Sequence, residues 1–559
     1  MNALSAEPVE TAQRLAAIDI GTNSVRLIVV EVAEDGRYRM IDDEKEVTRL
    51  GRGLNETGNL QPDAMDRTVE VVARMREIAE GYGIVRVRAV GTSAVREARN
   101  RDEFVKLLED RAGLTPEVIT AEEEARLAFL SVSHAFDLRP FGAAAVVDIG
   151  GGSTEVVLTA GGVIEQIGTL PIGAVRLTEQ LESGTEPLEV RLKGLRRSIS
   201  RMIKAGLGKP DVKPQIMFGT GGTFTALANL SFQKNSIAPQ GDTHPFTLRG
   251  YEIKRSEIRH IFRWLSAMPV RERARIPGLS PDRAEIIVAG IAIIERLMKY
   301  LGVNTLRVHD RGIRDGLILE TIQEMVPRAE PVGALPADRA RTARQFAAAC
   351  KYDEPHSEHV ARLTLSIFDQ LVEALDAPSA PWAQSEAREL LHVAAILHDI
   401  GYYINYARHH KHSYHLIMHS DLPGFTHREL ELVANIARYH RRARPKRKHM
   451  NFVKLNAEER GLVKALVAIL RLADGLDRAH SQFVQSVRVE VKSATAWFFV
   501  AAETDPVVDI WGASRKSRLF ERVFGLDCRF EWEAVAGTGS APARASGPRP
   551  RASASEESP

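Results

Sequence analysis

Two short segments of this sequence carry residue types that handle phosphate. Residues 16–25 read AAIDIGTNSV and residues 145–154 read AVVDIGGGST, so the same order of apolar residues, Asp, small residues and hydroxyls occurs twice. Each copy continues into a second β-rich stretch, which predicts a strand–turn–strand hairpin. Glycine in such a turn permits unusual backbone conformations and lets a ligand approach the main chain.

The predicted turns favour phosphate binding with a cation. Successive N–H groups and hydroxyls around a tight turn form a concave anion site. Because carboxylates repel phosphate, Asp19 and Asp148 indicate a divalent cation or an attacking water between them and the phosphate. A third turn, GTGGT at 219–223, precedes a predicted helix whose first N–H groups form another anion site. One such turn is more often a plain hairpin, but three together favour a phosphate cleft.

The elements that must position these turns alternate along residues 15–325. Stretches such as 15–20, 25–32, 143–150 and 154–160 read as strands, and helical stretches such as 63–83 lie between strands. This alternation predicts an α/β layered fold. Since the hairpin is duplicated, we expect two subdomains, 15–140 and 141–325, that close on a cleft.

Six motifs in this region carry a family resemblance. They are DIGTNSVRL (19–27), AVGTSAVREARN (89–100), AEEEARLAFL (121–130), DIGGGSTEVV (148–157), GTGGT (219–223) and GIRDGLILE (312–320). The hairpin pair resembles the actin-like (ribonuclease H-like) ATPase superfamily, and the whole set resembles the exopolyphosphatase/guanosine pentaphosphate phosphatase family. The resemblance implies a homodimer that hydrolyses the terminal phosphoanhydride of inorganic polyphosphate or guanosine pentaphosphate with Mg²⁺.

The resemblance also implies residue roles. Glu124, directly before Ala–Arg, is the catalytic glutamate that polarises water, and Asp148 and Glu155 form a second catalytic acidic pair that, with Asp19, holds Mg²⁺ or water. Arg96 clamps a phosphate. Without the family context, EEEAR also reads as a solvated first helical turn and Arg96 as a surface ion-pair residue. The phosphate-binding residues expected from the turns and the resemblance are Thr22, Asn23, Ser24, Thr92, Ser93, Arg96, Gly150, Gly151, Gly152, Ser153, Thr154, Gly221, Gly222 and Thr223.

Two basic segments, 191–204 and 438–449, could guide a long polyanion. The first places its basic side chains on one arc of a predicted amphipathic helix, and basic residues crowd the second without an acidic one. A charge run is usually a solvated face, but two runs in a chain of net charge +2 favour a polyphosphate track. Nucleic acid is not expected, because neither run interleaves aromatic residues for base stacking. The predicted track residues are Lys193, Arg197, Arg201, Arg441, Arg442, Arg444 and Lys446.

Residues 340–480, after a predicted linker at 326–339, are mainly helical and rich in histidine. HSEHVARL (356–363), LLHVAAILHDIGYYI (390–404) and LRLADGLDRAH (470–480) resemble the HD phosphohydrolase superfamily. The resemblance implies a second divalent-metal site, distinct from the Mg²⁺ site, made of His359, His398, Asp399 and Asp474, with His412 or His440 as a further ligand. In the phosphatase family this domain has commonly lost its ligands, so the alternative is an all-helical scaffold with satisfied core histidines.

Composition and length bound the remaining possibilities. A chain of 559 residues is too long for a single hydrophobic core, so several domains are expected. One of them is a small α+β segment at 481–535. Residues 536–559 lack large apolar side chains, which predicts a disordered tail, and 1–14 read as a flexible N-terminus without a signal-peptide core. The longest apolar run, 286–294, is half of a bilayer span, so no membrane span is expected. Two cysteines without a disulfide framework suit the cytoplasm.

Other functions stay open at this point. The same cleft could serve as a guanosine pentaphosphate 5′-phosphohydrolase. An actin-like kinase or ATPase would need a nucleoside pocket and an acceptor other than water, and a sensor would bind guanosine polyphosphates without turnover. The His/Asp set adds the hypothesis of a second phosphohydrolase activity in residues 340–535.

Overall fold

The computed structural model describes residues 13–33, 36, 38–235, 248–325, 339–420, 422, 424–441 and 443–535. The predicted N-terminal segment up to residue 12, the linker at 326–338, Arg442 and the tail from 536 lie outside the described residues. The chain forms two compact units. The first runs to Phe346 and includes His415–Ala434, and the second contains Ala347–Tyr414 and the residues from Asn435 onward.

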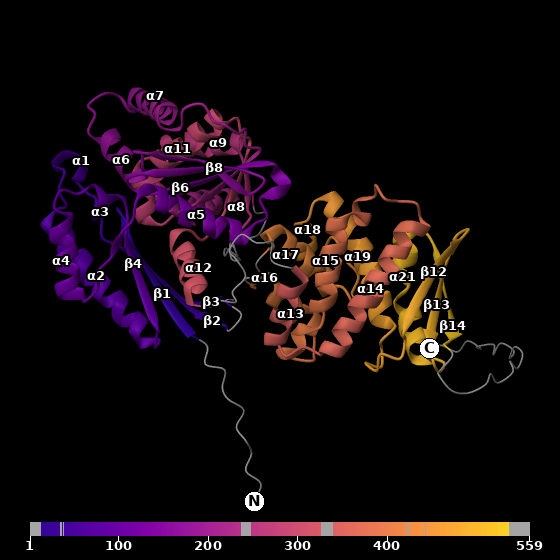
Figure 1. Ribbon diagram of the computed structural model, residues 1–559. Helices are drawn as coiled ribbons and strands as arrows, with labels where there is room; N and C mark the ends of the chain where they lie inside the picture. Colours follow the sequence, from indigo (N-terminus) through magenta and orange to yellow (C-terminus); the bar gives the residue numbers. More distant parts are fainter. Residues whose placement is uncertain are drawn as a thin grey trace, which may run out of the picture. The chain divides into compact units, whose positions relative to one another are not determined.

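The first unit contains two sheets with the same strand order (Figure 1). The first sheet contains β1 (Gln13–Ile20), β2 (Ser24–Val32), β3 (Tyr38–Val47), β4 (Arg86–Gly91) and β5 (Glu117–Val118), in the order β3-β2-β1-β4-β5. The second contains β6 (Ala143–Ile149), β7 (Thr154–Ala160), β8 (Val163–Leu170), β9 (Ile216–Thr220), β10 (Glu252–Lys254) and β11 (Thr305–Val308), in the order β10-β11-β9-β6-β7-β8.

Within the second sheet, β8-β7-β6-β9-β11 repeats the order of the first sheet, with β10 added at one edge. In both sheets the first hairpin is antiparallel and the fourth strand of the repeat runs parallel to the first. This topology confirms the predicted α/β fold with duplicated actin-like subdomains. β1 begins at Gln13, within the segment that the sequence predicts to be flexible.

Helices cover both faces of each sheet. They are α1 (Leu54–Thr57), α2 (Pro62–Gly81), α3 (Ser93–Glu97), α4 (Arg101–Ala112), α5 (Ala121–Ala135), α6 (Ala174–Glu182), α7 (Leu188–Leu207), α8 (Gly222–Asn235), α9 (Arg255–Ser266), α10 (Val270–Arg273), α11 (Pro281–Leu301) and α12 (Ile313–Met325). Alternate residues of β1 face two cores: Ile18 packs with α2 and α4, and Ala17 packs with α5 and α12. Burial on both faces explains the nearly continuous apolar sequence of this strand.

Helix α5 belongs to the cores of both subdomains. Its Leu127 packs in the core beneath β1, whereas Ala125 and Val132 pack with Val146 of β6. A helix fixed by apolar contacts on two sides cannot rotate without exposing buried side chains, each worth about 1.5–3 kcal/mol. Residues in the first turn of α5 therefore have a fixed position between the two sheets.

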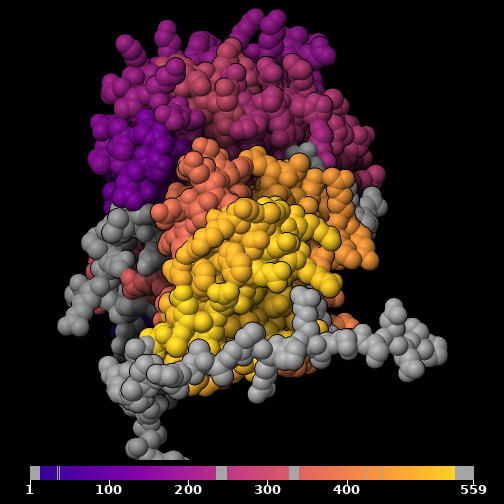
Figure 2. All heavy atoms as spheres, turned by 90° about the vertical axis from the view of Figure 1, so that its right-hand side faces the viewer, coloured from indigo at the N-terminus to yellow at the C-terminus, as the bar shows by residue number. Residues whose placement is uncertain are grey.

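The second unit is mainly helical and ends in a small sheet, as the sequence predicts. The helices from residue 339 onward are α13 (Arg339–Ala349), α14 (Glu354–Ala374), α15 (Ser385–Leu397), α16 (His409–Met418), α17 (His427–Arg438), α18 (Met450–Val453), α19 (Ala457–Gly475), α20 (Val507–Lys516) and α21 (Arg518–Phe524). The sheet contains β12 (Ser486–Lys492), β13 (Thr495–Ala502) and β14 (Asp527–Ala534), and the last described residues form the yellow face in Figure 2. Along the described stretches, no helix combines the length and apolar character that a bilayer crossing requires.

The packing of α12 on α5 predicts the effect of adding one methyl group. A Cβ on Gly316 would lie 2.2 Å from the carbonyl oxygen of Leu127, a main-chain atom that cannot move aside alone. Gly316→Ala should therefore lower the free energy of unfolding by about 1–3 kcal/mol. Gly194, exposed within α7, has no atom within 4 Å of an added Cβ, so Gly194→Ala should leave stability unchanged or raise it by about 0.5–1 kcal/mol. Urea midpoints measure both, and equal midpoints would contradict the prediction.

Candidate active site

The two predicted hairpin turns share one backbone hydrogen bond. The Gly21 N–H donates to the Ser24 carbonyl at 3.1 Å, and the Gly150 N–H donates to the Ser153 carbonyl at 3.0 Å. In each turn, the four residues that follow the Asp–Ile pair close the hairpin. They are residues 21–24 in the first copy and 150–153 in the second. The duplication seen in the sequence is a duplication of local geometry.

The two turns meet where the subdomains face each other. A Cβ on Gly151 would lie 2.9 Å from the Cβ of Thr22, and a Cβ on Gly152 would lie 2.4 Å from the Ser93 hydroxyl oxygen. Only glycine permits so close an approach of one main chain to the other turn. Lys45 of β3 pairs with Asp282 of α11 at 2.6 Å, which also joins the two subdomains.

Three carboxylates gather beneath the turns. Glu124 of α5, Asp148 of β6 and Glu155 of β7 each offer an oxygen, and these three oxygens lie within 4.8 Å of one another. All three side chains are buried. Glu124 stands in the first turn of α5, where the Thr120 hydroxyl caps the helix by accepting from the Glu123 N–H at 3.1 Å. Asp148 and Glu155 are directly opposite in the antiparallel pair of β6 and β7.

The two copies of the hairpin differ in charge at one paired position. In the first, Asp19 lies opposite Arg26, so the carboxylate has a cationic cross-strand neighbour. In the second, Asp148 lies opposite Glu155, so two carboxylates share the pair. Like charges directly opposite in a sheet are destabilising unless a cation lies between them. The second hairpin therefore carries the stronger requirement for a bound cation.

Two donors hold the carboxylates that face the turns. Arg96 of α3 donates from Nη1 to Oε2 of Glu124 at 3.0 Å and to the Ile119 carbonyl at 3.0 Å. The Thr220 hydroxyl donates to Oδ1 of Asp148 at 2.6 Å. Arg96 thus contacts the predicted base directly, and its guanidinium fixes the orientation of Glu124.

Several buried polar atoms have no partner among the described residues. These atoms are Oδ1 of Asp19, both carboxylate oxygens of Glu155, Nδ2 of Asn23 and Oγ of Ser153. A buried polar group without a hydrogen bond costs about 1–3 kcal/mol, so such groups point to a ligand. Orphaned carboxylate oxygens beside orphaned donors fit a hard, oxygen-binding cation such as Mg²⁺ next to an anion.

Burial controls the protonation of the acidic cluster. It raises the pKa of Glu124 to about 8, although the Arg96 guanidinium acts in the opposite direction. Burial, followed by the charges of Glu124 and Asp148, holds the pKa of Glu155 well above its usual range. Burial also raises the pKa of Asp19 to about 6, against the lowering effects of Arg26 and Arg314. Without a cation, the cluster therefore retains protons that a divalent ion would displace.

Several of the other predicted phosphate-binding residues already have hydrogen bonds within the protein. Thr92 and Ser93 are buried at the start of α3, and the Ser93 hydroxyl donates to Glu97 at 2.9 Å. The Thr154 hydroxyl donates to the Ile172 carbonyl, so it serves the fold. At the third turn, Gly221 has a φ of 94°, and its Cβ position would lie 2.8 Å from Asp148 Oδ1. Gly222 and Thr223 begin α8 beside it, so the helix starts where the sequence predicts it.

The predicted track residues fall in both units. Lys193, Arg197 and Arg201 are exposed along α7 in the first unit. In the second unit, Lys446 is exposed and Arg444 is half-buried. Arg441 lies beside histidine, with Nη1 at 3.1 Å from Nδ1 of His409.

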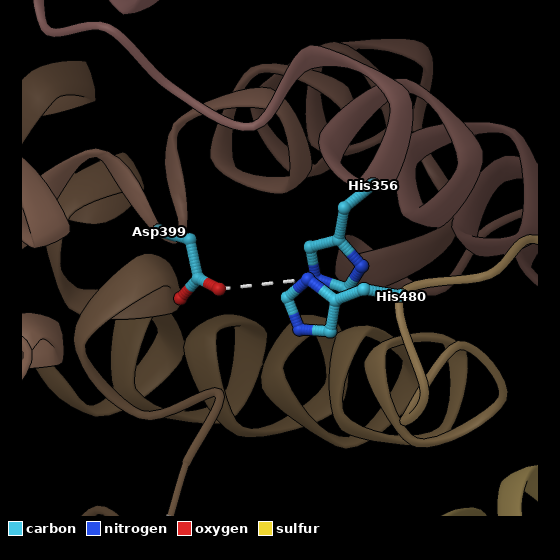
Figure 3. Close-up of side chains that lie close together, drawn as sticks. All are labelled: His356, Asp399 and His480. Carbon is cyan, nitrogen blue, oxygen red and sulfur yellow. Dashed lines mark ion pairs between the residues drawn. The ribbon is translucent and has the colours of Figure 1, made fainter.

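The second unit gathers most of the predicted His/Asp set. His398, Asp399, Asp474 and His440 lie in buried groups of potential metal ligands, together with His356 and His409. Sequence reasoning missed His356 and His409. His359 belongs to none of these groups within the described part of the chain, and its Nδ1 contacts Arg362 at 2.6 Å. Asp477 contacts Nδ1 of His356 at 2.8 Å, a contact between segments far apart in the sequence that the local pattern does not reveal. Figure 3 shows the ring of His480 stacked on that of His356 beside Asp399, with ring centroids 3.7 Å apart.

Comparisons with known proteins match both units. The model of the Ppx/GppA phosphatase family matches residues 28–325, and that of Ppx/GppA phosphatase domain III matches residues 339–505. The chain is 28% identical over 432 residues to a guanosine-5'-triphosphate,3'-diphosphate pyrophosphatase of Vibrio campbellii, covering 76% of this chain and 80% of that protein. It is 27% identical over 428 residues to the Vibrio cholerae protein of the same name, with the same coverage. The crystal structure of an exopolyphosphatase from Cytophaga hutchinsonii matches with 26% identity and a TM-score of 0.50, covering 57% of this chain and 100% of that one.

The raised pKa of Glu124 predicts how the metal-free protein responds to pH. Its carboxyl binds a proton more tightly when folded, with a pKa of about 8 against the ordinary 4.5 of a glutamate. The stability it contributes is therefore complete below pH 4.5 and is lost as the pH rises through 8. With EDTA present, Tm should fall from about pH 6 to about pH 9, and it should fall less in Glu124→Gln.

Mg²⁺ in place of EDTA should restore the Tm of the wild type at the higher pH, because the cation takes over the role of the proton. Glu122→Gln, at an exposed position two residues away, should follow the wild type in EDTA. Thermal melts at both pH values test this. Equal pH slopes for the wild type and Glu124→Gln would contradict the assignment.

Proposed function

The chain belongs to the Ppx/GppA phosphatase family, and from this premise we propose that it hydrolyses the terminal phosphoanhydride of inorganic polyphosphate and releases orthophosphate. The observation that carries the proposal is the buried group of Glu124, Asp148 and Glu155 beneath two facing glycine turns. Three carboxylates of which Arg96 contacts only Glu124 suit the hydrolysis of a phosphate bound with a metal, in which water is the acceptor.

The proposed roles follow from the partners of each carboxylate. Glu124, oriented by Arg96, accepts the proton of the attacking water. Asp19, Asp148 and Glu155 would hold Mg²⁺, which when bound offsets the charge of the phosphoryl oxygens. Alignment of water with the phosphorus matters more than base strength, because effective positioning alone is worth about 7–11 kcal/mol.

The turns supply donors to the terminal phosphate. The Asn23 amide and the Ser153 hydroxyl, which have no hydrogen-bond partner in the described part of the chain, bind its oxygens together with the main-chain N–H groups of both turns. The water oxygen forms a bond to the terminal phosphorus as the bridging P–O bond breaks. The electron pair of that bond leaves with the shortened chain, and the water proton passes to Glu124.

A guanosine pentaphosphate 5′-phosphohydrolase is the second candidate. Guanosine pentaphosphate presents the same kind of terminal anhydride to the same side chains. The Vibrio relatives carry the name of a guanosine nucleotide pyrophosphatase. The exposed basic row of Lys193, Arg197 and Arg201 on α7 favours a longer anion as the main substrate. We expect kcat/KM to be larger with long-chain polyphosphate than with guanosine pentaphosphate. A larger kcat/KM with the nucleotide would make the nucleotide the main substrate and contradict the proposal.

Removing the base should abolish most turnover. Glu124→Ala should lower kcat for orthophosphate release by about 10²- to 10⁴-fold, because a positioned general base contributes that much. Glu122→Ala, exposed in the same helical turn, should keep wild-type kcat. Malachite-green assays with Mg²⁺ and polyphosphate measure both. Full activity in Glu124→Ala, or transfer of phosphate from ATP to a sugar in place of hydrolysis, would overturn the proposal.

The basic row on α7 should matter only for long chains. Replacing Lys193, Arg197 and Arg201 by Gln in one triple variant should raise KM for long-chain polyphosphate about three- to tenfold. The KM for tripolyphosphate should stay unchanged. A matched triple variant removes three exposed charges from other helices of the same unit, at Arg259, Arg263 and Lys299. If both triple variants raise KM for long-chain polyphosphate equally, the basic row on α7 does not guide the polyphosphate chain.

A further inference from the structure

A buried group of hydrogen-bonded side chains lies further along α5, two helical turns after Glu124. The hydroxyl of Ser131 in α5 donates to Oδ2 of Asp315 in α12 at 2.9 Å. The same hydroxyl oxygen lies 2.8 Å from Nε2 of His309, the residue that directly follows β11. None of the three side chains is more than 3% exposed, so these bonds form away from solvent.

The second oxygen of the carboxylate extends the group to the other subdomain. Oδ1 of Asp315 accepts from the Tyr38 hydroxyl and, at 2.9 Å, from Nη1 of Arg311. Tyr38 begins β3 of the first sheet. At the opposite end, the His309 N–H donates to the Gly219 carbonyl of β9 in the second sheet at 2.9 Å. The group therefore connects one sheet to the other through α5 and α12.

The donors and acceptors of this group allow one arrangement of protons. A carboxylate only accepts, and the Ser131 hydroxyl has a single proton, which it donates to Asp315. The hydroxyl oxygen must then accept from Nε2–H of His309. Burial lowers the pKa of His309 to about 4, so the ring is neutral at pH 7 and Nδ1 carries no proton. In agreement, Nδ1 has no hydrogen-bond partner among the described residues.

The group contains the residue types of a nucleophilic hydrolase, but its bonds run in another order. A nucleophilic serine donates to its histidine, which donates in turn to the acid. Here the Ser131 hydroxyl donates to the acid and accepts from His309. Both side chains are 0% exposed, so no substrate reaches the hydroxyl. The group is built to hold elements in place.

The element that the group holds most directly is α5. Ser131 follows Glu124 by seven residues, which at 3.6 residues per turn is about 20° short of two full turns. The two side chains therefore leave the same face of the helix. Apolar contacts keep α5 between the sheets, but they are not directional. A fully satisfied buried network is directional and specifies one orientation.

We propose that Ser131, His309 and Asp315 are positioning residues for the acidic cluster. Their hydrogen bonds fix the rotation of α5 about its axis, and with it the place of Glu124 relative to the two carboxylates of the second hairpin. The effect on turnover rests on the proposed function, because it acts through Glu124 as the base. The effect on α5 itself does not.

Steady-state kinetics test the effect on turnover. Ser131→Ala should lower kcat for orthophosphate release from polyphosphate about 10- to 100-fold, because a misplacement of about 1 Å at the reacting groups costs up to that much. KM should stay unchanged, since the turns that bind the phosphate are intact. Ser133→Ala removes a hydroxyl that donates within the same helix, to the Leu130 carbonyl, and should keep wild-type kcat.

A double-mutant cycle separates positioning of Glu124 from general damage. If Ser131 acts through Glu124, then Ser131→Ala should cause no further loss of kcat in the Glu124→Gln background. ³²P-labelled polyphosphate makes the low residual rate measurable. An equal loss in both backgrounds would show that Ser131 does not act through Glu124 and would overturn the proposed role.

The identity of the donor at position 309 provides a second test. His309→Gln can still present an N–H to the Ser131 oxygen and should stay within about threefold of wild-type kcat. His309→Leu cannot, and its kcat should fall as in Ser131→Ala. Circular dichroism melts identify any variant that fails to fold. Equal kcat in folded His309→Gln and His309→Leu would contradict the role of this hydrogen bond.

Hydrogen exchange tests the position of α5 without substrate. In Ser131→Ala, amides of residues 121–128 should exchange about tenfold faster than in the wild type, because the helix turn that carries Glu124 loses its fixed orientation. Ser133→Ala should not change them, and peptides of α2 should be unchanged in both variants. Unchanged exchange at 121–128 would overturn the inference. A wild type that releases no orthophosphate but shows the faster exchange in Ser131→Ala would refute the proposed function alone.

Discussion

Negative charge buried without an equal positive charge is the constraint on which the candidate sites depend. Glu124, Asp148 and Glu155 are buried within 4.8 Å of one another, and Arg96 contacts only the first of them. Removing an ionised carboxylate from water costs several kcal/mol even after relaxation. The fold therefore tolerates the cluster only with protons or with a cation.

Duplication supplies the geometry, and divergence between the copies supplies the chemistry. Both hairpins close with the same backbone hydrogen bond, which places Asp19 and Asp148 at equivalent positions. The cross-strand partner is Arg26 in one copy and Glu155 in the other. A cation paired with the first carboxylate limits the total negative charge, whereas two acids in the second copy create a place for a metal. One difference at a repeated position thus balances the charge of the first hairpin and concentrates negative charge in the second.

The sequence was sufficient to predict features that depend on local pattern. The strands at 143–149 and 154–160, the helix at 62–81 and the glycine turns follow from apolar alternation and turn chemistry, which neighbours in the chain determine. The choice between His356 and His359 was different. Both are buried on one helix, three residues apart, and only the position of Asp399, Asp474 and Asp477 in space makes His356 the member of the cluster. Periodicity cannot distinguish buried faces that meet different partners.

Donor chemistry separates the two centres of this chain. The first-unit cluster of Glu124, Asp148 and Glu155 offers only oxygen atoms, which suits a hard ion. The second-unit cluster surrounds one carboxylate with imidazoles whose outer nitrogens are held by Asp477 and by main-chain carbonyls. Rings fixed in this way would lose little entropy on binding a metal, which favours a tightly held ion. The ligand atoms, rather than total charge, decide which ions each cluster favours: hard ions for the oxygen-only cluster, and first-row transition ions for the mixed imidazole and carboxylate cluster.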